Sequence, residues 1–147
     1  MKPQFDVSQA GDMPRVIIEG NYYNGKCFPS LNNMLASYSR SPKIGAALKR
    51  KFQRICCDEI REQLKGWQAN KPLIGHFIYY EPKDGHYRDF PNIHCFASKV
   101  WWDAMQDCGV IRGDDPKYVL NETHDFMYCE NVGETRIEVY LEEVSEV

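Results

Sequence analysis

The feature that most constrains the fold is a long amphipathic helix that begins after Ser41. Ser41 can cap the helix, and Pro42 suits its first position, where a missing N–H breaks no hydrogen bond. From there to about Gly66, apolar residues recur on one face: Leu48, Phe52, Ile55, Cys56 and Ile60. Such a stripe has to be buried against a second layer, so the rest of the chain must supply one.

The other periodic segments supply that layer. A short β-branched strand is predicted at residues 16–18, and an apolar strand from Leu73 to Glu81 ends at Pro82. A second helix is predicted from about Asn92 to Cys108, closed by Gly109. Further strands are predicted at 117–120, 123–129 and 135–144, the last with a clean apolar–polar alternation that indicates a half-buried strand. This order predicts an α+β fold, a mixed β-sheet packed against two main helices, with an α/β arrangement as the alternative.

Length and composition predict one domain. The 147 residues are 43% hydrophobic, which is enough for a core. We expect a flexible leader at residues 1–14 and a single domain at residues 15–147. For a chain this short we expect part of the stability to come from a partner subunit, which would make the protein a dimer. The net charge of -3 argues against a protein that coats DNA by bulk charge.

The six cysteines include no Cys-x-x-Cys pair, and the chain has no apolar run long enough to cross a bilayer. Free thiols in a reducing cytoplasm are therefore expected, without zinc and without a membrane partner. Trp101 and Trp102 are predicted to lie in the core or in a dimer interface.

The first helix also carries a basic face. Arg50, Arg54, Arg61 and Lys65 fall within about 60° of one another, opposite the apolar stripe. Such a face is either an ordinary solvated surface or a contact for a phosphate backbone, and the stripe alone does not decide between them.

The stretch from 88 to 119 carries the chemistry. Asn92, Lys99 and Asp103 share one face of the second helix, Asp89 precedes it, and Asp114 and Asp115 follow it. If the flanking strands bring these acidic segments together, oxygen ligands meet beside a lysine, which suits Mg²⁺ and phosphoryl transfer. In the alternative interpretation Asp89 caps the helix and the Asp114–Asp115 pair forms a turn.

In their order, these residues resemble the RusA family of Holliday-junction resolvases, which is common in phages and prophages. The resemblance covers residues 15 to 144. It rests on these segments: Arg88-Asp89-Phe90-Pro91-Asn92, Lys99 four residues before Asp103-Ala104-Met105, Gly109-Val110-Ile111, Gly113-Asp114, and Pro29-Ser30-Leu31-Asn32 before the basic helix.

The resemblance implies a homodimer that resolves four-way junctions and related branched DNA by paired nicks, using Mg²⁺ or Mn²⁺. Asp89 and Asp114 match metal-binding aspartates, and Lys99 matches a lysine expected at the scissile phosphate. Asn92 would order the first acidic loop, and Asp103 and Asp115 would support the site. Such a protein would work in the cytoplasm, that of the bacterial host if a phage or prophage encodes it.

DNA contacts are expected from the basic helix and from two cations nearer the chemistry. Recognition should depend on junction shape and backbone contacts rather than on base edges. The expected residues are Lys43, Lys49, Arg50, Lys51 and Arg54, with Arg88 and Lys117 nearer the acidic loops.

One departure from the family pattern leaves alternatives open. Pro91 stands where the family has a second aspartate, and a proline side chain offers no ligand atom. Another group could fill this position: Asp84, His86, Asp103 or Asp115. Otherwise the protein binds branched DNA without cutting it, or it is a structural or regulatory protein whose acidic loops are only caps and turns.

Overall fold

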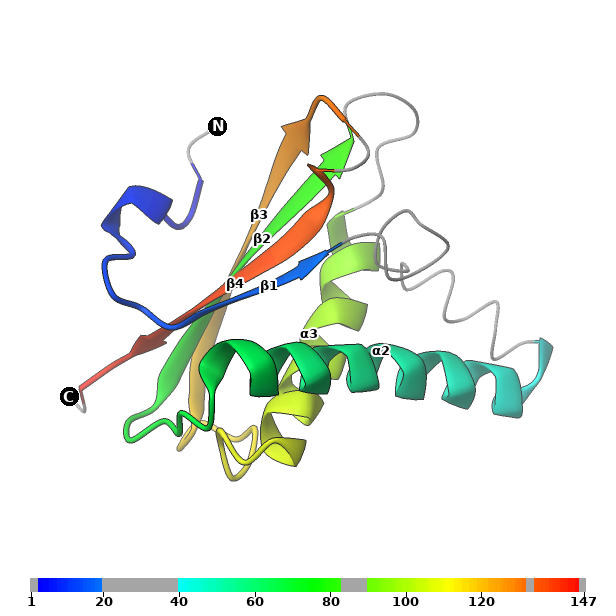
Figure 1. Cartoon of the computed structure of the whole chain (residues 1–147), viewed down its shortest axis with the longest axis horizontal. Coiled ribbons are helices and arrows are strands. Elements are labelled where there is room, and N and C mark those ends of the chain that lie inside the picture. Colours follow the sequence, from blue (N-terminus) through cyan, green and yellow to red (C-terminus); the bar gives the residue numbers. More distant parts are fainter. Residues whose placement is uncertain (1–2, 20–39, 83–89, 132–133, 146–147) are drawn as a thin grey trace.

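The computed structural model describes residues 3–19, 40–82, 90–131 and 134–145, without the side chains of residues 82 and 90–98. A four-stranded mixed sheet carries two helices on one face and an N-terminal segment on the other (Figure 1). The strands are β1 (Arg15–Glu19), β2 (Leu73–Pro82), β3 (Val119–Cys129) and β4 (Arg136–Glu143), and the helices are η1 (Val7–Gln9), α2 (Pro42–Leu64) and α3 (Phe90–Asp107). The predicted α+β architecture is confirmed at this level.

The strand order is β1-β4-β2-β3. β2 and β3 are parallel and are joined through α3, whereas β4 lies between β1 and β2 and is antiparallel to both. The prediction of two separate strands at 117–120 and 123–129 is wrong. β3 is continuous, because Asn121 and Glu122 pair with Ile74 and Gly75 after a register shift.

The predicted start of α2 is confirmed, since the Ser41 hydroxyl accepts the Lys43 N–H at 3.1 Å. The apolar stripe of α2 packs against α3 and β1. The core between the helices and the sheet contains the following buried side chains: Phe52, Cys56, Ile60, Phe77, Tyr79, Trp101, Trp102, Ala104, Met105, Val139 and Leu141. Gln63 of α2 also holds β1, because its side-chain amide exchanges two 2.8 Å hydrogen bonds with the backbone of Ile17.

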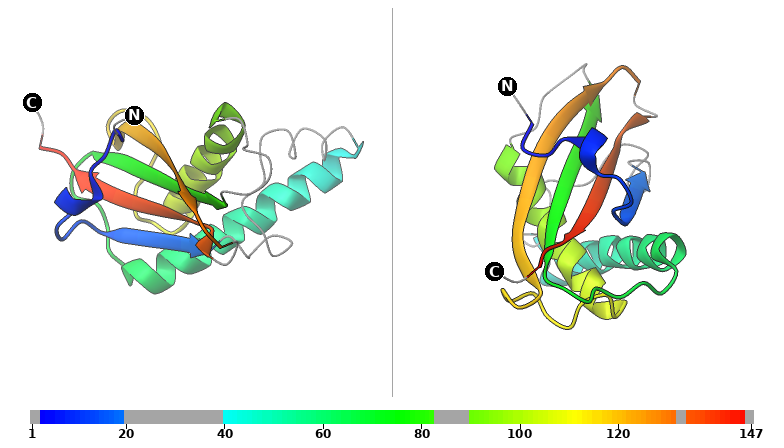
Figure 2. Two further views of the ribbon diagram at one scale, coloured as in Figure 1. Left: turned by 90° about the horizontal axis from the view of Figure 1, so that it is seen from above. Right: turned by 90° about the vertical axis from the view of Figure 1, so that its left-hand side faces the viewer.

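The segment expected to be a loose leader packs on the outer face of the sheet, the face away from α2 and α3 (Figure 2). Phe5 stacks on His76 with ring centroids 3.9 Å apart. The Asp125 carboxylate accepts the backbone N–H groups of Gln4 at 2.7 Å and Phe5 at 3.0 Å. The ring of Phe5 and the carboxylate of Asp125, which are 120 residues apart, therefore attach the N-terminal segment to the sheet. The composition of this segment alone indicated a loop.

The prediction of a half-buried strand at the C-terminus is half right. Ile137, Val139 and Leu141 do face the helices, as the alternation indicates. The opposite face of β4 is also covered, and there Glu138 and Tyr140 are only 6% and 4% exposed. β4 is a central strand beneath the N-terminal segment, a position that alternation alone cannot reveal.

In the part of the chain that the structure describes, neither long helix is apolar enough to cross a membrane. The cysteines described there, Cys56, Cys57, Cys108 and Cys129, are free thiols, as predicted.

Candidate functional site

The basic face of α2 is exposed. Between Pro42 and Cys57 this helix carries five cations and no acidic residue. Leu48, Phe52 and Cys56 are buried, and their burial turns the opposite face outward. The outward cations include Lys43, Arg50, Lys51 and Arg54. In Figures 1 and 2 this end of α2 extends beyond the sheet, so its positive charge stands on a projecting element.

Lys49 faces α3 instead of open solvent. Its ammonium forms an ion pair with Asp103 at 3.0 Å, and both side chains are about 30% exposed. One helical turn further along, the Gln53 side chain donates to Asp107 at 2.5 Å. These bonds join α2 to α3, so the roles predicted for Lys49 on DNA and for Asp103 beside the metal compete with a bond that each already makes.

Lys99 lies halfway along α3 and is exposed. Among the described residues, its ammonium has no hydrogen-bond or ion-pair partner. Asn92 also lies in α3, but its side chain is not part of the description. Arg88, Asp89, Asp84 and His86 lie outside the described residues, so their predicted roles stay predictions.

The two predicted aspartates of the loop between α3 and β3, Asp114 and Asp115, have different surroundings. Asp115 forms the turn, since its side chain accepts the Lys117 N–H at 2.9 Å and its carbonyl accepts the Tyr118 N–H at 2.9 Å. This is the turn interpretation that the sequence left open. Asp114 is exposed, and within the described ranges its carboxylate makes no hydrogen bond or ion pair. Asp114 is therefore the carboxylate of this loop that is available to a ligand.

Those predicted site residues whose side chains the structure describes do not gather at one point. The α3–β3 loop lies at the far end of α3 from Phe90 (Figure 1). An 18-residue helix is about 27 Å long, and Lys99 stands about 13 Å from the start of α3. Among the residues described, no three His, Cys, Asp or Glu side chains gather as a metal site would require. One chain thus presents Asp114 and Lys99 as separate exposed groups.

A hydrogen-bonded chain on the helix side of β3 was not predicted, and the sequence had offered His124 no partner. Glu122 accepts the indole N–H of Trp102, and its other oxygen lies 2.9 Å from His124 Nε2. His124 Nδ1 lies 2.8 Å from the Tyr79 hydroxyl. Alternation along β3 places residues 122 and 124 on one face and could have indicated their pairing.

Burial disfavours the reactive form of the two α2 thiols, Cys56 and Cys57. Burial raises the pKa of Cys57 to about 12, and burial likewise raises the pKa of Cys56. Both groups stay protonated at neutral pH, and the reactive form of cysteine is the thiolate.

The chain matches no protein-family model and no curated protein.

Proposed function

We propose that this protein is a metal-dependent, structure-selective endodeoxyribonuclease of the RusA type that acts on four-way junctions and related branched DNA as a homodimer. The observation that carries this proposal is the exposed cationic half of α2. Four exposed cations, with no carboxylate on this half of the helix and on a protein of net charge -3, concentrate positive potential on one element. A polyanion such as the DNA backbone is the partner that this distribution favours.

Two free groups support a chemical role beyond binding. The Lys99 ammonium can contact a phosphate and stabilise the negative charge that develops on it during hydrolysis. The Asp114 carboxylate is a hard oxygen donor of the kind that Mg²⁺ prefers. Lys99 projects from the exposed side of α3, the helix that the Lys49–Asp103 pair joins to the basic helix. DNA bound along α2 would therefore lie close to Lys99.

The length of α3 bears on how a metal could be held. Asp89 precedes Phe90 in the sequence and Asp114 follows the other end of the helix. A two-fold axis that places two α3 helices antiparallel would bring the start of one helix to the α3–β3 loop of the other. We therefore propose that the metal is held between protomers, by Asp114 of one chain and the segment before α3 of its partner. When bound, the metal would supply an activated water and neutralise phosphate charge.

A specific observation favours a second candidate, a branched-DNA-binding protein that does not cut. Pro91 lies in the first turn of α3, where proline fits the helix but contributes no ligand. Asp103 and Asp115, two of the groups that could replace the missing aspartate, are already engaged. In this candidate the cationic face of α2 has the same role, and only the chemistry is absent.

A nicking assay on a synthetic four-way junction, with and without Mg²⁺, tests the nuclease proposal. We expect Mg²⁺-dependent paired nicks that Asp114→Asn abolishes while junction binding in a gel shift is retained. The matched control is Asp12→Asn, since Asp12 is equally exposed but lies in the N-terminal segment. Undiminished nicking by Asp114→Asn would remove this carboxylate from the mechanism.

The Pro91→Asp variant separates the two candidates. Binding without nicking by the wild-type protein, together with a large gain of Mg²⁺-dependent nicking by Pro91→Asp, would establish the binding protein. If the wild-type protein shows no preference for a junction over duplex DNA, both candidates fail and a structural or regulatory role is left.

A further inference from the structure

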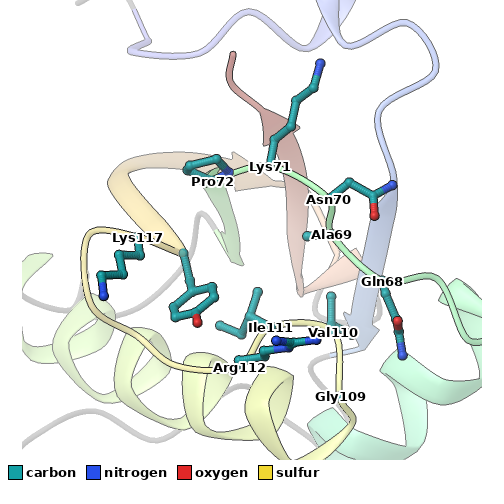
Figure 3. Close-up of a pocket in the computed structure, with 11 residues that line it drawn as sticks. Gln68, Ala69, Asn70, Lys71, Pro72, Gly109, Val110, Ile111, Arg112 and Lys117 are labelled. Atoms are coloured by element: carbon teal, nitrogen blue, oxygen red, sulfur yellow. The ribbon is translucent and has the colours of Figure 1, made fainter. Parts of the chain in front are cut away.

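A polar pocket of about 360 Å³ lies at the end of the sheet where β2 and β3 begin (Figure 3). Its walls are two loops, the one between α2 and β2 and the one between α3 and β3. Backbone hydrogen bonds link the loops to each other and to the strands: Ala69 N–H to the Val110 carbonyl at 3.0 Å, and Leu73 N–H to the Tyr118 carbonyl at 2.8 Å. The pocket is therefore preformed rather than dependent on loop closure.

Three cations line this pocket, and no acidic residue does so among the described residues. Arg112 and Lys117 come from the α3–β3 loop, and Lys71 comes from the opposite loop (Figure 3). All three side chains are exposed. Their charged ends make no hydrogen bond or ion pair in the described part of the chain. Asn70 adds an amide to the lining, and Tyr118 adds a hydroxyl.

Two described carboxylates on or beside these loops accept backbone N–H groups. Asp115 accepts the Lys117 backbone N–H at 2.9 Å, and Glu143 accepts the Asn70 backbone N–H at 2.9 Å. Neither of these carboxylates, nor the exposed Asp114 of the same loop, forms an ion pair with the three cationic side chains in the described part of the chain. Figure 3 draws these side chains in different directions, but all three are exposed and flexible, and an anion with several oxygen atoms is the ligand that complements them and the amide.

We infer that this pocket binds a phosphate group of the DNA backbone and positions it next to Asp114. The inference rests on the proposed nucleic-acid function and extends it to a second contact region, at the opposite end of α3 from Phe90. Asp114 stands in the chain between Arg112 and Lys117, so a phosphate held by these two cations lies beside the carboxylate predicted to bind metal. The basic face of α2 supplies affinity, and the pocket sets the register of the backbone at the cut.

A double-mutant cycle between protein and DNA tests this inference. The DNA is a four-way junction in which one phosphate at a time is replaced by a neutral methylphosphonate, and binding is measured by fluorescence anisotropy in EDTA. With wild-type protein, we expect the substitution to weaken binding severalfold at a phosphate close to the nicked bond. Arg112→Gln and Lys117→Gln should bind more weakly and be insensitive to the substitution at that same position.

The salt dependence provides an independent measurement on the same proteins. Loss of one phosphate contact should reduce the slope of log affinity against log salt by about 0.9. Lys117→Arg should keep the wild-type slope, because it keeps the charge. The matched control is Arg15→Gln, which removes one exposed cation from β1 and should remain sensitive to the methylphosphonate. Thermal unfolding of each variant identifies any that has lost its fold.

The outcomes separate this inference from the proposed function. If the wild-type protein binds junctions but the pocket variants keep its slope and its methylphosphonate profile, the pocket assignment is wrong and the nuclease proposal stands. If no DNA binds, both fail. Calorimetric saturation of the wild-type protein by inorganic phosphate, abolished by Arg112→Gln without any change in junction binding, would assign the pocket to a free anion and overturn the inference.

Discussion

The two faces of the sheet are covered in different ways. On the helix side, α2 and α3 bury large apolar side chains, among them Phe52, Phe77 and Trp101, each at most 1% exposed. On the outer face, a short irregular segment covers polar residues that are paired one by one. There His76 contacts Thr123 and Glu142, and Tyr140 donates to Glu138 at 2.8 Å.

The difference shows which face stabilises the whole fold. Burial of apolar area is non-directional and large, so the helix side should set the free energy of unfolding. Each polar pair on the outer face contributes about 1 kcal/mol net, because folding exchanges water for protein partners. The outer face should therefore control a local attachment, that of the N-terminal segment, more than global stability.

The largest expected effect is that of Trp101→Ala, which empties the centre of the helix-side core. We expect the free energy of unfolding in urea to fall by about 3–5 kcal/mol. Trp101→Phe is the control, because the Trp101 indole N–H is buried without a partner among the described residues. Trp101→Phe should lower the free energy of unfolding much less than Trp101→Ala does. Equal decreases for the two variants would show that this site does not behave as a packed core.

Gly75→Ala tests how closely α3 approaches the sheet. A Cβ at Gly75 would lie 2.6 Å from Cζ2 of Trp102, an atom of a rigid ring. We expect overpacking to cost about 2 kcal/mol. The double variant Gly75→Ala/Trp102→Leu should lose less free energy of unfolding than the sum of the two single variants, because leucine makes room for the added methyl group. Strict additivity in urea unfolding would contradict this contact.

On the outer face, Asp125→Ala removes the acceptor of the Gln4 and Phe5 N–H groups. We expect a loss of about 1–2 kcal/mol, with Asp125→Asn milder because it keeps one oxygen acceptor. Hydrogen exchange should accelerate at the N-terminal segment and stay slow in α3. Equal acceleration in both regions would show that the outer face unfolds together with the core.

The smallest expected effect is a pH dependence at Tyr140. Burial raises the pKa of Tyr140 above its ordinary value of 10.0, and the Glu138 carboxylate that accepts its hydroxyl proton adds to this. The unfolded chain therefore loses this proton first as the pH rises. Stability from this group is present below pH 10 and declines through the higher pKa of the folded state. In thermal unfolding measured as a function of pH, Tyr140→Phe should reduce the loss of stability above pH 10. If the loss is unchanged in this variant, other groups cause it.

Local signals placed the elements well. The Ser41–Pro42 start, the apolar stripe of α2 and the core position of the two tryptophans were readable, because each depends on neighbours within a few turns. The Lys49–Asp103 pair was not readable, because its members are 54 residues apart and no periodicity links them. Nor was the pocket, whose three cations come from two different loops.

By itself, the sequence determined which segments become helix and strand and which of their faces are apolar, since side-chain periodicity follows directly from backbone geometry. Only the tertiary structure decided the strand order, the covering of β4 by residues near the N-terminus, and the bonds that join α2 to α3. These features depend on which distant segments pair, and many pairings satisfy the same local pattern. The packing of the whole chain selects one of them.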